Sequence, residues 1–208
     1  MSRSRKIALV GNPNAGKSAL FNALTGARQK IANYPGVTVE RKFGRFVLPT
    51  GEPVEMTDLP GAYGLDPTSP DEEVTSKVVR GQFPGEAEPD VLVIVLDASN
   101  LEQHLVFAQE LLSLGKPTVI ALNMVDLAER DGLVLDPLVL QQELGVPVIP
   151  TVAVRRRGLV VQVRNRLRHR LEHRCRVHQQ GRHHWCPGPR DAGRMGRADH
   201  ALQSAVSA

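Results

Sequence analysis

The chain has 208 residues, 41% of them hydrophobic, and a formal net charge of +4 at neutral pH. This length suits one well-buried α/β domain with a short additional segment. No stretch approaches the roughly 18 to 20 consecutive apolar residues that a membrane-spanning helix requires. The charged start is followed by only four apolar residues, Ile7 to Val10, which is too few for a secretory signal. We therefore expect a soluble, cytoplasmic protein.

The charge is distributed unevenly along the chain. Residues 155–208 contain 13 arginines, no lysine and three acidic residues, whereas residues 1–154 carry a net negative charge. Six of the seven histidines, both cysteines and the tryptophan also lie in this C-terminal segment. The composition predicts a folded domain over residues 1–158 and an Arg/His-rich tail over residues 159–208.

Short apolar runs alternate with helical patterns along the first 150 residues. Such alternation predicts a mainly parallel sheet with helices on both faces. We expect strands at 7–10, 42–48, 53–58, 91–96, 118–122 and 146–149, and helices at 16–26, 101–115 and 136–145. The predicted sheet is therefore six-stranded.

The first apolar run leads directly into "GNPNAGKS", Gly11 to Ser18, and then into a helical pattern. This Gly-x-x-x-x-Gly-Lys-Ser sequence between a strand and a helix is typical of a phosphate-binding loop. Its backbone N–H groups and the helix N-terminus attract phosphate, Lys17 would reach the β- and γ-phosphates, and Ser18 would bind Mg²⁺. The alternative is a glycine-rich turn with a solvated Lys17.

Two later motifs complete a guanine-nucleotide site. In "DLPG", Asp58 ends a predicted strand and can hold Mg²⁺ through water, while the Gly61 N–H can sense a γ-phosphate. In "LNMVD", the Asp126 carboxylate can accept two hydrogen bonds from guanine but not from adenine, and Asn123 would brace the base-binding loops. The alternatives are a common turn and a polar strand end with a helix cap.

A mobile first switch is predicted at "NYPGVTVER", Asn33 to Arg41. Thr38 is the threonine placed to give its hydroxyl to Mg²⁺ and its N–H to the γ-phosphate. GTP would order such a segment and hydrolysis would release it.

Together "GNPNAGKSALFNALTG", "NYPGVTVERK", "DLPGAYGL" and "LNMVD" closely resemble the cytoplasmic G domain of the bacterial ferrous iron transport protein B family. The resemblance covers roughly residues 5 to 159. It implies a Ras-like P-loop GTPase fold, GTP and GDP as ligands, Mg²⁺ as cofactor, and slow GTP hydrolysis that regulates a ferrous iron transporter. The implied nucleotide contacts are Gly11, Asn12, Pro13, Asn14, Ala15, Gly16, Lys17, Ser18, Ala19, Asp58, Leu59, Pro60, Gly61, Asn123, Met124, Asp126 and Ala153. Ala153 belongs to "TVAVRRRG", which resembles the fifth motif of the family.

The resemblance also implies a second cation. Ala62 occupies the place where many small GTPases carry a water-orienting glutamine. In the family, K⁺ near the phosphates is held partly by the asparagine that corresponds to Asn14 and by carbonyls of the first switch. The resemblance thus implies catalytic contributions from Lys17, Thr38, Gly61 and Asn14, with Ser18, Thr38 and Asp58 around Mg²⁺ and Asn14 at K⁺.

The tail departs from the family, in which a helical domain and a membrane-embedded permease follow the G domain. The leucine and valine spacing of residues 159–171 is compatible with one more helix, and we expect disorder from Cys175 onward. The abrupt change in composition resembles a GC-rich coding region translated out of frame. Cys175, Cys186, His183 and His184 match no standard zinc spacing, and no specific nucleic-acid recognition is expected from the arginines.

Three readings of function follow. The first is the GTP-binding and slowly GTP-hydrolysing domain of a ferrous iron transporter. It would act at the cytoplasmic side of the inner membrane, with a permease that this sequence does not contain. The second is an RNA- or ribosome-associated GTP switch anchored by its basic tail. The third is a non-functional gene fragment.

Overall fold

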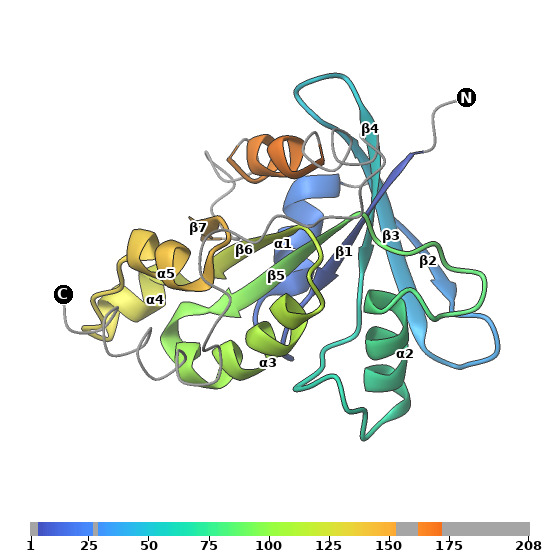
Figure 1. Cartoon of the computed structure of the whole chain (residues 1–208), viewed down its shortest axis with the longest axis horizontal. Helices are drawn as coiled ribbons and strands as arrows, with labels where there is room; N and C mark the ends of the chain where they lie inside the picture. The colour runs from blue at the N-terminus through green and yellow to red at the C-terminus, as the bar shows by residue number, and fades with distance from the viewer. Residues whose placement is uncertain (1–3, 27–28, 153–161, 172–208) are drawn as a thin grey trace.

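The computed structural model describes residues 4–26, 29–152 and 162–171. They form one sheet flanked by helices on both faces (Figure 1). The strands are β1 (Arg5–Val10), β2 (Gln29–Asn33), β3 (Glu40–Val47), β4 (Pro53–Asp58), β5 (Val91–Asp97), β6 (Thr118–Asn123) and β7 (Val148–Pro150). The helices are α1 (Lys17–Thr25), α2 (Pro70–Val79), the short 3₁₀ turn η1 (Ala98–Asn100), α3 (Leu101–Ser113), α4 (Val125–Arg130) and α5 (Pro137–Leu144), and residues 162–171 form a further helix.

The sheet has the order β2-β3-β4-β1-β5-β6-β7. Strands β4, β1, β5, β6 and β7 run parallel, and the hairpin of β3 and β4 is antiparallel, as the sequence predicted. The predicted six strands become seven because β2 pairs antiparallel with β3 from Gln29↔Gly44 to Asn33↔Glu40. This edge strand carries no buried apolar run, and Ile31 is 62% exposed, so its pairing with β3 rather than its own pattern makes it a strand.

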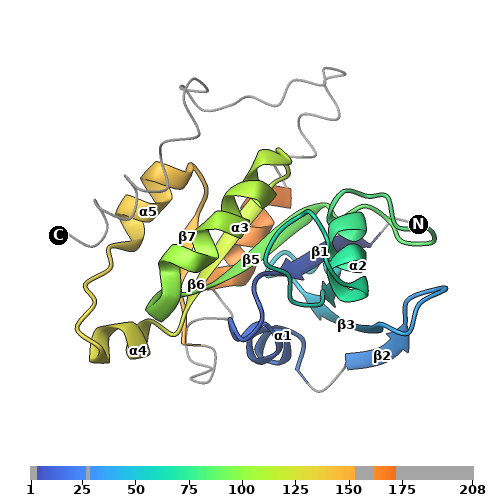
Figure 2. The same cartoon turned by 90° about the horizontal axis from the view of Figure 1, so that it is seen from below.

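Apolar side chains of alternate strand positions fill two cores, one on each face of the sheet. Helices α2 and α3 cover one face, and α1 with the helix of residues 162–171 covers the other (Figures 1 and 2). On the second face Leu20, Phe21 and Leu24 of α1 are almost fully buried beside Val163, Leu167 and Leu171. Helices on both faces are therefore confirmed.

Arg164 adds polar contacts to the apolar packing of the helix of residues 162–171. Arg164 donates from Nη2 to the Leu24 carbonyl at 2.7 Å, and its guanidinium lies 4.9 Å from the centre of the Phe46 ring. These contacts join the helix to the end of α1 and to β3. The predicted disorder of the tail and the cysteine and histidine residues from Cys175 onward lie outside the described residues.

Helices α2 and α5 begin at capping residues that are recognisable in the sequence. Asp136 caps α5 by accepting from the Leu138 N–H at 2.8 Å, Pro137 begins the helix, and Gly145 ends it with φ 68°. Helix α2 was not predicted, although it has the same signals: Ser69 accepts from the Glu72 N–H at 3.3 Å and Pro70 begins the helix. The capping residues were thus sufficient evidence for both helices.

The parallel strands place the predicted motifs at one edge of the sheet. The phosphate loop follows β1, Asp58 ends β4, Asp97 ends β5 and Asn123 ends β6. Because these four strands are neighbours and run parallel, their carboxyl ends meet at the same edge, where ligands of open α/β sheets bind.

Candidate nucleotide-binding site

The phosphate loop fits tightly between β5 and β6. A Cβ at Gly11 would lie 2.4 Å from the Val95 carbonyl oxygen, and one at Gly16 would lie 2.2 Å from Asn123 Nδ2. Gly16 also has φ +86°, in the left-handed region that favours glycine. Glycine is therefore required at both positions, because the loop lies directly against the ends of β5 and β6.

Lys17 is buried at the start of α1. Its Nζ donates to the carbonyl oxygens of Gly11 at 3.1 Å and of Asn12 at 2.9 Å. Burial lowers the pKa of Lys17, and the nearby Asp58 carboxylate opposes this shift. The ammonium group thus lies at the loop whose backbone would surround a phosphate.

Asp58 and Ser18 meet beside the loop, as the sequence predicted. Ser18 Oγ donates to Asp58 Oδ2 at 3.2 Å, while Asp58 Oδ1 is buried without a hydrogen-bond partner in the described part of the chain. Burial raises the pKa of Asp58, and Lys17 opposes the shift. A buried, unpartnered carboxylate oxygen next to a hydroxyl is a donor set that suits a hard cation such as Mg²⁺.

The segment after β4 packs directly on the phosphate loop. A Cβ at Gly61 would lie 2.9 Å from the Pro13 backbone nitrogen. The Leu59 N–H donates to the Leu9 carbonyl at 3.0 Å, and Thr75 Oγ1 donates to the Pro60 carbonyl at 2.9 Å. Gly61 is therefore needed for contact between the "DLPG" motif and the loop.

Two glutamates hold the residues that follow Gly61, and sequence reasoning missed both. Glu72 accepts from the N–H of Tyr63 at 3.2 Å and from the N–H and hydroxyl of Thr68 at 2.9 and 2.7 Å. These bonds, chiefly those of Thr68, lower the pKa of Glu72. Glu110 of α3 accepts from the Leu65 N–H at 2.7 Å. The Ser69-x-x-Glu72 spacing at the start of α2 was the available signal for Glu72.

The first switch, residues 33–41, does not bring Thr38 to the other predicted Mg²⁺ ligands. Thr38 is exposed, whereas Tyr34 and Val39 on either side of it are buried. The Tyr34 N–H donates to the Val39 carbonyl at 3.0 Å and the Val37 N–H to the Tyr34 carbonyl at 3.3 Å. Within the described ranges no hydrogen bond joins Thr38 to Ser18 or Asp58. Its role at Mg²⁺ stays a prediction.

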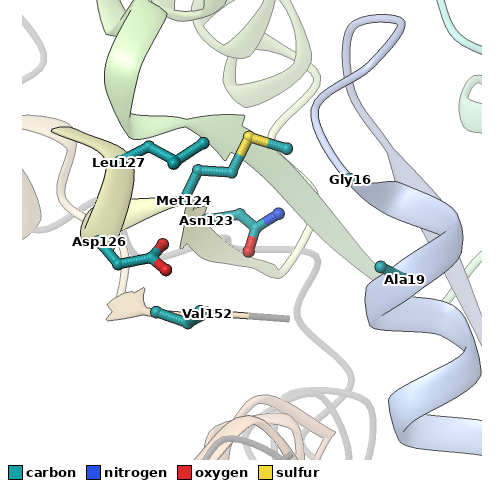
Figure 3. Close-up of a pocket in the computed structure, with 7 residues that line it drawn as sticks. All are labelled: Gly16, Ala19, Asn123, Met124, Asp126, Leu127 and Val152. Carbon is teal, nitrogen blue, oxygen red and sulfur yellow. The ribbon is translucent and has the colours of Figure 1, made fainter. Parts of the chain in front are cut away.

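A pocket of about 190 Å³ lies between α4 and the start of α1 (Figure 3). Asn123, Met124 and Asp126 lie on one side of it, and Gly16 and Ala19 on the other. Leu127 and Val152 also line it and were not predicted. Ala153, expected near the base, lies outside the described residues.

Asn123 connects this pocket to the phosphate loop. Its Nδ2 donates to the Ala15 carbonyl at 3.0 Å, and its Oδ1 accepts from the Thr151 hydroxyl at 3.3 Å. The predicted bracing by Asn123 therefore joins three segments. Asn14 lies at the exposed part of the loop with φ 62°, and its contact with a cation stays a prediction.

His104 of α3 is buried against the end of β5. Its Nδ1 accepts from the Asp97 N–H at 3.2 Å, and the residue is 4% exposed. Burial lowers the pKa of His104, against the opposing effect of Asp97. The imidazole is therefore a neutral acceptor that fixes the end of β5.

The described residues lack two features, a cluster of metal-binding side chains and a membrane-spanning helix. Residues 4–26, 29–152 and 162–171 contain no group of three or more histidine, cysteine or acidic side chains arranged to hold a metal ion. The helices in these ranges include none with the length and apolar character needed to cross a bilayer.

The glycine loop after β1, the acidic end of β4 and the asparagine-aspartate pocket after β6 define the class of this protein as a Ras-like P-loop GTPase fold. A family model described as ferrous iron transport protein B matches residues 5–165. The chain belongs to the ferrous iron transport protein B family. This membership supports the iron-transporter interpretation over the RNA-associated alternative.

Individual relatives agree with this assignment. The chain is 47% identical over 157 residues to the Fe(2+) transporter FeoB of Salmonella typhimurium and 46% identical to that of Escherichia coli K12. Each alignment covers 74% of this chain and 20% of the relative. The chain thus spans about a fifth of the length of these relatives.

Solved structures of cytosolic FeoB domains share the fold. The cytosolic domain of L. pneumophila FeoB matches with a TM-score of 0.72 at 44% identity, covering 79% of this chain and 68% of that one. A mutant of S. thermophilus NFeoB bound to mGDP matches with a TM-score of 0.72 at 40% identity, with coverages of 80% and 61%. The GMPPNP form of the T. maritima cytosolic domain matches with a TM-score of 0.71 at 36% identity, with coverages of 80% and 64%.

Proposed function

We propose that this chain binds GTP and GDP at the carboxyl edge of its sheet and hydrolyses GTP slowly in a Mg²⁺-dependent reaction. The observation that carries the proposal is the unpartnered buried oxygen of Asp58, which lies beside Ser18 and near Lys17. The pocket lined by Asn123, which is joined to the phosphate loop by the Asn123–Ala15 hydrogen bond, supports a neighbouring site for the base. Structures of relatives described as bound to GDP and mGDP support the choice of ligand.

Each part of the site has a role in this reaction. The backbone N–H groups from Asn14 to Ser18 and the start of α1 would bind the β-phosphate. Lys17 would leave the Gly11 and Asn12 carbonyls for the β- and γ-phosphate oxygens. Ser18 and Asp58 would hold Mg²⁺, which neutralises phosphate charge when bound.

The first switch, residues 33–41, and a second switch, which begins with the "DLPG" motif of residues 58–61, would act at the γ-phosphate. Gly61 lies against Pro13 of the loop, which supports a role for its N–H at the γ-phosphate. Thr38 is exposed and has to move inward to reach it. The Leu59 and Pro60 bonds to β1 and α2 would keep the second switch in place while the first one moves.

Guanine would be selected by Asp126. The carboxylate lines the pocket (Figure 3) and accepts the paired donors of guanine, whereas adenine lacks them. Met124, with φ 60°, and Ala19 supply apolar surface for the base.

We also propose that K⁺ stimulates hydrolysis. The methyl side chain of Ala62 has no polar group to orient water, and the exposed Asn14 supplies an amide oxygen at the loop. Phosphate release measured in KCl and in NaCl tests this directly. Equal rates in the two salts would contradict it.

In the whole protein this domain would regulate ferrous iron transport. The chain spans about a fifth of its relatives, so the membrane permease is a proposed partner and the cytoplasmic face of the membrane a proposed location. The sequence similarity to Fe(2+) transporters supports both.

The test is guanine-nucleotide binding by the full chain, followed by calorimetry or with a fluorescent GDP analogue. We expect GDP to bind, ATP not to displace it, and Asp126→Asn to weaken it. Glu73→Gln, on the exposed part of α2, is the matched control and should bind like the parent. Displacement of GDP by ATP, or no effect of Asp126→Asn, would contradict the proposal.

A further inference from the structure

A short turn between α2 and β5, residues 83–86, contacts the first switch at two points. The rings of Phe83 and Tyr34 meet edge to face, with centroids 5.1 Å apart and an interplanar angle of 62°. Glu86 pairs with Arg41 at 2.9 Å. A Cβ built on Gly85 would be in ordinary contact with the Pro35 ring, at 4.0 Å. None of the GTPase motifs includes this turn.

The turn is built to be rigid. In Phe83-Pro84-Gly85-Glu86 the Glu86 N–H donates to the Phe83 carbonyl at 3.2 Å, and Gly85 has φ +81°. Proline at the second position and a glycine with positive φ at the third are the requirements of a type II turn. Such a turn presents Phe83 and Glu86 in a fixed relation.

The contacts of this turn decide where Thr38 lies. Tyr34 is 1% exposed under Phe83, and its backbone bonds with Val39 and Val37 close the loop that carries Thr38. On the far side of the loop Arg41 lies in the ladder between β3 and β2, where it pairs with Ala32. With both ends of the loop anchored, Thr38 stays exposed and away from Ser18.

The anchored arrangement leaves polar groups unsatisfied. The Tyr34 hydroxyl and Arg41 Nε are buried without hydrogen-bond partners among the described residues. Buried polar groups without partners disfavour the conformation that buries them. An arrangement in which Tyr34 leaves Phe83 is therefore accessible to a ligand that favours it.

We propose that Phe83 and Glu86 are positioning residues that hold the first switch in a docked state, with Thr38 outside the site, and thereby weaken binding of a nucleoside triphosphate relative to the diphosphate. This inference rests on the proposed function. Only a γ-phosphate with its Mg²⁺ draws Thr38 inward. The triphosphate therefore binds the undocked fraction, and its apparent affinity falls with that fraction, whereas GDP binds both states.

The binding test uses the full chain carrying Phe83→Leu or Glu86→Gln, with Glu73→Gln as control. We expect the Kd of a non-hydrolysable GTP analogue with Mg²⁺ to fall roughly three- to tenfold in both variants, with the Kd of GDP changing less than about twofold. Glu73→Gln should leave both constants unchanged. Equal changes in Kd for the two nucleotides would indicate a purely structural role. A rise in the Kd of the analogue alone would mean that the turn supports the triphosphate-bound state. Either result overturns the proposal.

Amide hydrogen exchange without nucleotide tests the docking by itself. We expect Phe83→Leu to speed exchange at Tyr34 and Val37 and to leave the β1 amides, Ile7 to Val10, unchanged. Unchanged exchange at Tyr34 overturns the docked state even where no nucleotide binds. If GDP fails to bind the parent chain while exchange at Tyr34 still responds, the proposed function fails and the docking stands. If the Phe83→Leu variant does not unfold cooperatively, the same exchange measurement is made on Glu86→Gln, which keeps the side-chain volume.

Discussion

Asn123 donates a hydrogen bond from Nδ2 to the Ala15 carbonyl at 3.0 Å, across 108 positions of sequence. The bond crosses from the end of β6 to the phosphate loop. A Cβ on Gly16 would occupy the same space as this amide. The proposed base pocket and the phosphate loop are therefore directly connected by a buried side chain.

Asn123→Ala should weaken the fold and the site together. The change leaves the Ala15 carbonyl and the Thr151 hydroxyl without this partner, which costs roughly 1 to 3 kcal/mol of unfolding free energy. We expect GDP affinity to fall by about tenfold or more. Chemical denaturation and nucleotide titration measure the two effects. The control is Asn100→Ala, because the exposed Asn100 amide bonds only to Gln103 among the bonds described. A similar loss of stability and GDP affinity in this control would contradict the role of Asn123.

Asp58→Asn should stabilise the nucleotide-free protein while weakening Mg²⁺-dependent binding. Burial raises the pKa of Asp58 above 3.8, so folding favours its protonated form. Its contribution to stability is complete below pH 3.8 and is lost as the pH rises through the raised pKa.

The asparagine variant does not titrate, so its advantage in unfolding free energy should grow as the pH rises from about 4 toward neutral. Thermal or urea unfolding at several pH values, without nucleotide or Mg²⁺, measures this difference. A difference that does not vary with pH would show that the carboxylate is not the cause.

Glu72→Gln should slow GTP hydrolysis more than it weakens GDP binding. Glu72 accepts three hydrogen bonds from Tyr63 and Thr68, and the amide holds them less well than the carboxylate. Misplacing the second switch should lower the turnover rate roughly tenfold. Single-turnover phosphate release measures it. The matched control is Glu73→Gln, because Glu73 is the exposed neighbour of Glu72 and pairs with Lys77 at 2.6 Å. Equal effects of the two substitutions on turnover would count against a role of Glu72 in hydrolysis.

Leu167→Ala should destabilise the whole domain. Leu167 is fully buried among apolar side chains of α1 and the sheet, and such truncations cost roughly 2 to 5 kcal/mol. Asn165→Ala, at an exposed position of the same helix, should have little effect. By the same argument a chain ending at residue 158 should melt at a lower temperature than one ending at residue 171. Equal melting temperatures would place the domain boundary at 158.

The sequence by itself determined the local features of this protein. The phosphate loop, the strands on either side of it and the capped helix α5 follow from glycine, proline and apolar spacing within a few residues. The meeting of Asp58 and Ser18 also followed, because parallel neighbouring strands bring their carboxyl ends to one edge.

Only the tertiary structure decided the features that depend on partners far along the chain. Strand β2 exists through its pairing with β3. His104 is buried against the end of β5, and Glu72 accepts a hydrogen bond from Tyr63, nine residues earlier in the chain. The position of Thr38 depends on Phe83, a residue beyond the next helix, through Tyr34. Local propensity extends over one turn or one strand, whereas these contacts form between segments that only the folded sheet brings together.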